Sequence, residues 1–141
     1  MHVAVIACLL GSCAAVWDFG ECFEAQLDFL VNFCGLGAGL FITGGEDREI
    51  TVCGEGGLSI PRSFERSIAS ALARDEFREI GEKDMHEAAD MTGVKLLYRQ
   101  ELIKQAPYGL DGVGVTFECE NSAISSIMND VLAMLGAELG G

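Results

Sequence analysis

The stretch LFITGGEDREITVC, residues 40–53, carries the clearest structural signal in the chain. Two short segments rich in β-forming residues, Leu40–Thr43 and Glu49–Cys53, flank a turn of glycine and acidic residues. This pattern predicts an antiparallel hairpin with a loop of about four or five residues. More glycines follow, so a third strand at Leu58–Ile60 would extend the sheet.

Helical periodicity surrounds the hairpin on both sides. Apolar side chains recur three and four positions apart, with charged residues on the opposite side. Glycines and prolines between these stretches set the boundaries, because Pro61 suits a first helical turn and Pro107 ends a helix. The chain therefore predicts helices over residues 21–34, 61–80 and 82–92, the last continuing helically over 94–105, and a final helix that ends near Leu139.

The remaining segments lie near the two ends of the chain. Residues 3–17 favour a buried helix because they are apolar on all sides, although Val3–Cys8 would also suit a strand. Residues 113–119 alternate apolar and polar side chains, as a half-buried strand does. Asn121 or Ser122 can cap the last helix.

These elements follow the order α-α-β-β-α-α-β-α and contain no βαβ repeat. The chain has 141 residues, half of them apolar, which suits one compact domain over residues 1–141. We therefore expect an α+β fold in which a small antiparallel sheet packs against several helices.

Charge is distributed unevenly along the chain. The sequence has 22 acidic and 9 basic residues, which gives a net charge of −13. No Lys or Arg precedes Arg48 or follows Lys104, so both ends of the chain are purely acidic. This balance disfavours nucleic acid and anionic membranes as partners.

If the two ends lie together, their acidic side chains form one surface. Such a surface attracts basic proteins and does so less strongly as salt rises. The alternative is that these residues only keep an apolar chain soluble. The residues assigned to the surface are Asp18, Glu21, Glu24, Asp28, Glu118, Glu120 and Asp130.

The six cysteines have no spacing typical of a metal or redox motif, because no two are separated by two residues. Most lie in apolar runs, so we expect reduced, buried thiols and no bound metal or cofactor. Cys22 is the candidate for exposure, and its acidic neighbours Glu21 and Glu24 should raise its pKa. A redox or metal sensor is the alternative.

The apolar N-terminal run resembles the hydrophobic region of a signal peptide. The residues before it include no Lys or Arg, whereas a secretory signal begins with positive charge. No apolar run reaches the roughly 18 residues that span a bilayer. We therefore expect a cytoplasmic protein.

Motifs for nucleotide binding and serine catalysis are absent. Gly35–Gly39 lacks the third glycine of a dinucleotide-binding turn, and the chain contains no Gly-Lys-Ser/Thr sequence. His86 is the one histidine away from the terminus. On the expected helix, Glu82, His86 and Asp90 would share a face that could hold a metal ion or orient a general base, or that simply faces solvent.

Residues 49–93 resemble the CheX/CheC-type phospho-aspartate phosphatases of chemotaxis in their order of elements. If Glu87 takes the place of that family's glutamate, Lys83 and Asp90 occupy the flanking positions, where the family has an acidic or serine residue and an asparagine. The resemblance implies a carboxylate-based phosphatase or hydrolase that uses Asp84, Glu87, Asp90 and His86.

The sequence on balance favours a non-enzymatic module that binds a basic protein, as inhibitors, immunity proteins, chaperones and adaptors do. Its high apolar fraction also leaves room for a homodimer interface. The carboxylate-based hydrolase and the cysteine sensor stay open as alternatives.

Overall fold

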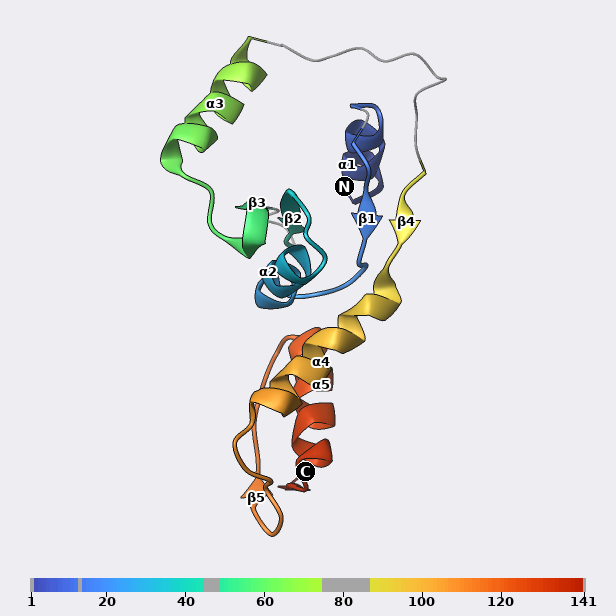
Figure 1. Ribbon diagram of the computed structural model, residues 1–141, viewed down its shortest axis with the longest axis vertical. Coiled ribbons are helices and arrows are strands. Elements are labelled where there is room, and N and C mark those ends of the chain that lie inside the picture. The colour runs from blue at the N-terminus through green and yellow to red at the C-terminus, as the bar shows by residue number, and fades with distance from the viewer. Residues whose placement is uncertain (1, 13, 45–48, 75–86, 141) are drawn as a thin grey trace.

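The computed structural model describes residues 2–12, 14–44, 49–74 and 87–140 (Figure 1). These residues form short strands and five α-helices, so the predicted α+β class is confirmed. The helices are α1 His2–Leu10, α2 Glu24–Phe33, α3 Arg62–Ala73, α4 Leu96–Gln105 and α5 Ser122–Met134. The strands are β1 Trp17–Asp18, β2 Ala38–Ile42, β3 Ile50–Gly54, β4 Ala89–Asp90, β5 Gly114–Val115 and β6 Glu138–Leu139, and the 3₁₀ turns are η1 Glu55–Gly57 and η3 Thr92–Lys95.

The predicted hairpin is present as the antiparallel pair β2–β3. Its register places Leu40 opposite Val52. The expected third strand is reduced to one bridge between Cys53 and Ser59. The hairpin is therefore the antiparallel sheet around which this part of the chain packs.

Helix α2 packs directly on β2, and one glycine makes this possible. A Cβ at Gly39 would lie 2.6 Å from Val31 Cγ2 and 2.7 Å from Cys53 Sγ, closer than side chains tolerate. Glycine at this position therefore lets the strand approach the helix. The buried core comprises Phe19, Leu27, Leu30, Val31 and Cys53.

Two further strand pairs are parallel, which the sequence did not predict. Strand β1 pairs with β4, placing Trp17 beside Ala89, and β5 pairs with β6, placing Gly114 beside Glu138 (Figure 1). Each pair joins segments from distant parts of the chain, so no local turn signal accompanies it. The half-buried strand expected over residues 113–119 shortens to β5, because β6 offers only two residues to pair with.

Helix α1 is shorter and more exposed than expected. It ends at Leu10, where Gly11 and Ser12 form a turn, and none of its residues is buried. Val3 is 77% exposed. Residues 2–10 therefore form a helix rather than a strand, but the prediction that this helix is buried was wrong.

The prediction of a helix over residues 82–92 is also wrong for the part that the structure describes, which begins at residue 87. Ala89 and Asp90 form a strand instead. The N–H of Ala89 donates to the carbonyl of Val16 at 2.9 Å, and that of Met91 donates to the carbonyl of Asp18 at 2.8 Å. Pairing with β1 therefore overrides the local preference of this stretch for helix.

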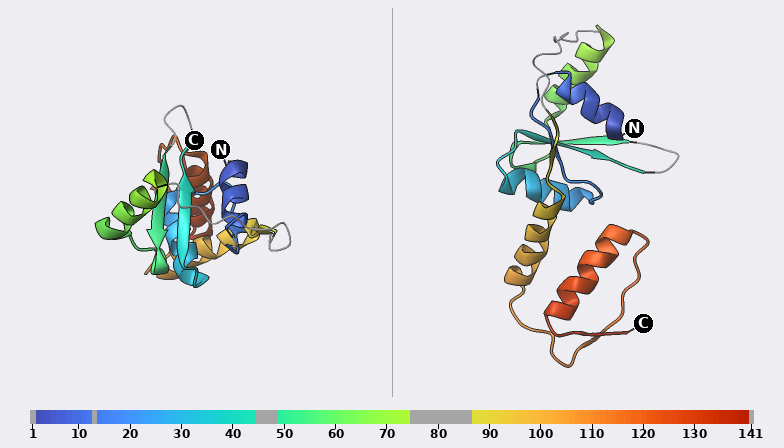
Figure 2. Two further views of the ribbon diagram at one scale, coloured as in Figure 1. Left: turned by 90° about the horizontal axis from the view of Figure 1, so that it is seen from above. Right: turned by 90° about the vertical axis from the view of Figure 1, so that its right-hand side faces the viewer.

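The chain exposes more surface than a compact protein of its mass. Its accessible surface is 9993 Å², against about 7,000 Å² from the usual scaling of area with mass. Helix α3 contributes to the difference, since its residues 62–70 are all exposed. Helices α3 and α5 lie toward opposite ends of the long axis in Figure 1 and in the right-hand view of Figure 2. None of the described helices has the length and apolar character needed to cross a bilayer.

Candidate functional site

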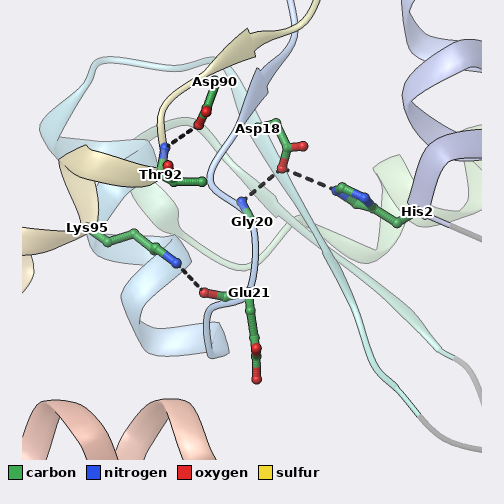
Figure 3. A network of polar contacts seen from close by, with 7 residues as sticks. All are labelled: His2, Asp18, Gly20, Glu21, Asp90, Thr92 and Lys95. Atoms are coloured by element: carbon green, nitrogen blue, oxygen red, sulfur yellow. Dashed lines mark hydrogen bonds and ion pairs between the residues drawn. The ribbon is translucent and has the colours of Figure 1, made fainter.

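Two aspartates end the parallel pair β1–β4, and each fixes the turn that follows it (Figure 3). The Asp18 carboxylate accepts from the N–H of Gly20 at 2.8 Å, and Nε2 of His2 lies 3.2 Å from the same oxygen. The Asp90 carboxylate accepts from the N–H of Thr92 at 3.0 Å. Hydrogen bonds from that N–H and from the Thr92 side chain hold the pKa of Asp90 below its usual range.

Lys95 ties the turn after β1 to the start of α4. Its Nζ donates to the backbone carbonyl of Glu21 at 2.6 Å, as Figure 3 shows. The buried side chain of Gln26 donates to the Lys95 carbonyl at 3.4 Å. These two contacts hold the Lys95 backbone and its ammonium group at the edge of a cleft.

The Glu21 side chain reaches the N-terminus of α5. Its Oε1 accepts from Ser122 Oγ at 3.2 Å, across 101 positions of sequence. Asn121 caps the same helix, because its Oδ1 accepts from the N–H of Ile124 at 3.1 Å. A carboxylate at a helix N-terminus also interacts favourably with the helix dipole. The contact therefore joins Glu21 of the acidic N-terminal segment to Ser122 of the acidic C-terminal segment.

Arg99 and Asp130 form an ion pair between α4 and α5. Nη1 of Arg99 lies 2.7 Å from Oδ2 of Asp130. Nε of the same guanidinium is enclosed, yet it has no hydrogen-bond acceptor within the described part of the chain. Buried N–H groups normally have an acceptor. One donor of Arg99 is therefore enclosed without a partner.

These side chains line a cleft of about 360 Å³ between α4 and α5. Two cations and two carboxylates contribute to its walls, so its local charge sums to zero in a chain of net charge −13. Hydroxyl groups and a few apolar side chains complete the lining. The polar and charged residues are Glu21, Gln26, Thr92, Lys95, Arg99, Ser122, Ser126 and Asp130.

The structure divides the predicted acidic surface into two groups. Four of its residues have partners within the chain: Asp18, Glu21 and Asp130 as above, and Asp28, which hydrogen-bonds to the Cys53 thiol. The other three, Glu24, Glu118 and Glu120, are exposed and form no hydrogen bond or ion pair within the described residues. Only this second group is fully available to a partner.

Of the alternative carboxylate site, the structure describes only Glu87 and Asp90, and neither of them lies on a helix. Glu87 is exposed before β4, and Asp90 lies on β4 itself. Asp84 and His86 lie outside the described residues, as does Glu82. Since residues 89–90 are a strand, the helix face that would have aligned Glu82, His86 and Asp90 does not extend to Asp90. Within the described ranges, no group of three or more His, Cys, Asp or Glu side chains is placed to hold a metal ion.

Five cysteines fall within the described residues, and all five are free. Cys53 is buried, whereas Cys8 on α1 is exposed, so burial was predicted correctly for only one of these two. Cys22 is half-buried rather than exposed. Its pKa is raised as predicted, but mainly by burial; Asp18 adds to the increase and Lys95 opposes it.

A second, larger cavity of about 720 Å³ lies between α1, β1, α2 and β2. Most of its lining is apolar, and Asp18 and His2 lie at its polar edge. The sequence analysis missed this cavity because a pocket between elements that are distant in sequence leaves no local pattern. It also missed Lys95 and Arg99, whose spacing of four residues on a helix was the available signal.

Comparisons with known proteins give one weak similarity. The chain is 27% identical over 138 residues, 95% of its length, to the phosphoglucosamine mutases of two Tropheryma whipplei strains, Twist and TW08/27. It spans about 30% of the length of these curated relatives. No family model matches the chain.

Proposed function

We propose that the protein is a non-enzymatic module that binds a basic protein through its acidic surface. The observation that carries this proposal is the contact between Glu21 and Ser122, at 3.2 Å, which joins the acidic N-terminal segment to the acidic C-terminal segment. Fields from both segments add where they meet, and such fields attract a basic partner and speed its encounter.

Three exposed carboxylates support this proposal because they are not used inside the chain. Glu24 begins α2, and Glu118 and Glu120 precede α5. Within the described residues they have no hydrogen bond or ion pair. These three carboxylates can therefore form ion pairs with a partner without breaking a contact inside the chain. Asp130, in contrast, would have to break its ion pair with Arg99.

Exposed apolar surface also supports association with a protein. Phe33 is 58% exposed, Phe64 53% and Leu96 53%. An exposed apolar side chain loses its contact with water when a partner packs over it. A partner that covers part of this area would gain burial energy in addition to electrostatic attraction.

A salt-titrated pull-down with quantitative mass spectrometry tests the proposal. The triple variant Glu24→Gln, Glu118→Gln and Glu120→Gln removes the unused carboxylates. The matched control Glu49→Gln, Glu55→Gln and Glu65→Gln removes the same charge from exposed positions elsewhere. Basic proteins retained at low salt by the control and lost from the first variant would support the proposal. Equal retention by both variants would reject it.

The comparisons support a second candidate, in which the chain handles a phosphorylated amino sugar. The relatives are named phosphoglucosamine mutases, and the similarity covers 95% of the chain. The cleft supplies groups of the right chemistry: Lys95 and Arg99 for a phosphate, and Glu21 and Asp130 for an ammonium group. Because the chain spans about 30% of these relatives, we propose binding rather than the complete mutase reaction.

Nuclear magnetic resonance titration of the isotope-labelled chain with glucosamine phosphate tests this second candidate. Saturable shifts confined to the amides around Lys95, Arg99 and Ser122 are expected. Glucosamine without phosphate is the control ligand and should give much smaller shifts. Shifts that are absent, or that are spread over the whole chain, would reject the candidate.

A further inference from the structure

The β2–β3 hairpin has two apolar faces, and only one of them is closely packed. Helix α2 packs on the face that contains Gly39, and its Val31 there is 0% exposed. Leu40 and Ile42 alternate with Gly39 along β2, so their side chains point to the opposite face. Helices α1 and α2 lie on opposite sides of the hairpin in the right-hand view of Figure 2. Helix α1 is therefore the element that stands over the second face.

Helix α1 and the hairpin leave a large cavity between them. The cavity has a volume of about 720 Å³, and Val5, Ile6 and Leu9 of α1 line it. None of the residues of α1 is buried, so this helix does not close on the hairpin as α2 does. Voids larger than a water molecule are few in protein interiors, whereas ligand sites typically enclose about 300–1,000 Å³. The volume is therefore that of a ligand site.

Most of the cavity wall is apolar. Water is a poor occupant of such a space, because a bound water needs two to four polar partners. An apolar molecule would instead bury its own surface together with side chains of α1 and β2 that are now only half-buried. The apolar side chains that would gain this contact include Val5, Ile6, Leu9, Leu40 and Ile42.

The polar edge of the cavity carries negative charge. Oδ1 of Asp18 accepts from the N–H of Gly20 and lies 3.2 Å from His2 Nε2 (Figure 3), but Oδ2 has no hydrogen bond within the described residues. The Asp18 side chain is 29% exposed, so a ligand can reach it. The Glu21 side chain points away toward Ser122. Among the described residues, the lining includes no Lys or Arg.

We propose that this cavity binds an amphiphilic primary amine, with its alkyl chain between α1 and β2 and its ammonium group on Asp18. The apolar wall selects the alkyl chain, and the free carboxylate oxygen selects the cation. A fatty acid would instead place a second negative charge beside Asp18. The net charge of −13 adds a long-range attraction for the cationic amine. The inference rests on neither proposed function.

Titration of the full chain with three twelve-carbon probes tests the class of ligand. Trp17 is the single tryptophan and lines the cavity, so its fluorescence reports on the site. The probes are dodecylammonium, dodecanol and dodecanoate at pH 7, one ionic strength and concentrations below micelle formation. We expect the amine to bind about tenfold more tightly than the alcohol, because its ammonium group forms a charge-assisted hydrogen bond. Dodecanoate should bind most weakly.

The length of the amine gives a second measurement in the same titration. Removing one methylene from the alkyl chain should weaken binding about fourfold, because less apolar surface is buried. Binding of dodecanoate as tight as that of the amine would overturn the proposed class of ligand. The absence of a saturable change in Trp17 fluorescence with every probe would overturn the site itself.

Asp18→Asn tests the position of the ammonium group. Asparagine keeps an acceptor for the N–H of Gly20, so the turn after β1 is retained. The variant should bind dodecylammonium about tenfold more weakly and dodecanol unchanged. Glu65→Gln, at an exposed position outside the lining, removes the same charge and is the matched control. Equal weakening by the two variants would mean that net charge alone attracts the amine, which contradicts the proposal.

Val5→Phe tests the position of the alkyl chain, because the larger side chain fills part of the cavity. It should weaken all the probes that bind, whereas Val3→Phe, at a position that is 77% exposed and outside the lining, should not. Identical affinities for the two variants would place the amine elsewhere and reject the site. Sedimentation velocity covers the remaining occupant. A dimer that Val5→Phe abolishes, in a chain that gives no response to any amine, would assign the cavity to a second copy.

Discussion

The region around α2 and the hairpin, residues 19–60, and the region of α4 and α5, residues 96–139, are stabilised by different kinds of contact. The first buries one apolar cluster in which Leu30 and Val31 are 0% exposed. The second, as far as the structure describes it, buries Val131 and Leu132 and depends on a helix cap and an ion pair for the rest. Apolar burial therefore fixes the first region, and polar contacts align the second.

The two regions are in contact through one aromatic ring, in addition to the hydrogen bond between Glu21 and Ser122 at the cleft. The Tyr98 ring of α4 packs edge-on against Phe23 and Phe29, with ring centroids 5.5 and 5.3 Å away. Burial raises the pKa of Tyr98. This contact is apolar and tolerant of small rotations, whereas the bonds of Glu21 and Lys95 are directional.

The largest effect is expected from Leu30→Ala in the apolar cluster. Truncating a fully buried leucine costs about 3–4 kcal/mol of unfolding free energy, because it removes apolar burial and leaves a cavity. Leu132→Ala, in the second region, should cost less because Leu132 is 9% exposed. Urea denaturation measures both values. A larger cost for Leu132→Ala would reverse the comparison between the two regions.

Gly39→Ala tests the close packing of α2 on β2. The added Cβ would lie 2.6 Å from Val31 Cγ2 and 2.7 Å from Cys53 Sγ, so these side chains or the backbone must shift. We expect a cost of about 1–3 kcal/mol, as for other overpacked cores. Gly37→Ala is the matched control because nothing lies within 4 Å of its Cβ position. Equal unfolding free energies for the two variants would show that β2 does not depend on the close approach.

Asn121→Ala should have a smaller effect, and that effect should stay in the second region. Loss of the cap on α5 costs about 1 kcal/mol. Asn129→Ala, an exposed position within the same helix, is the control. Hydrogen exchange should quicken in α5 while the amides of α2 keep their protection. Faster exchange in both helices would mean that the two regions unfold as one unit.

The sequence patterns predicted the elements that are specified by residues close together in the sequence. The strands of the hairpin, the apolar helix α2 and the helix α5 capped by Asn121 are all found close to their expected positions. The elements that were predicted wrongly pair with segments that are far away in the sequence. Strand β4 was expected to be part of a helix, but its backbone pairs with β1 about seventy residues earlier.

The candidate site was only partly predictable, for the same reason. Glu21 and Asp130 were chosen for their charge, and both line the cleft. The cations Lys95 and Arg99 were missed because a net charge of −13 directed attention to the acidic residues alone. No sequence pattern could reveal that Glu21 contacts Ser122, since this contact spans 101 positions.

Cys22 lies where the two regions meet, and its reactivity reports on Lys95. Burial raises the Cys22 pKa above 9.0, Lys95 partly offsets the increase, and Asp18 adds to it. Lys95→Met should therefore raise the pKa further and move the midpoint of the alkylation rate to higher pH, while Lys104→Met should not. Mass spectrometry of the iodoacetamide-labelled peptide measures this midpoint.

The sign of the Cys22 effect on stability follows from the same shift. The folded thiol ionises at higher pH than the unfolded thiol, whose pKa is 9.0. Its contribution to stability is therefore present below pH 9.0 and is lost as pH rises through the folded pKa. Lys95→Met widens that interval, so its unfolding free energy should fall more steeply above pH 9.0 than that of Lys104→Met. Parallel curves for the two variants would mean that Lys95 aligns the cleft through its bond to the Glu21 carbonyl without acting on the thiol.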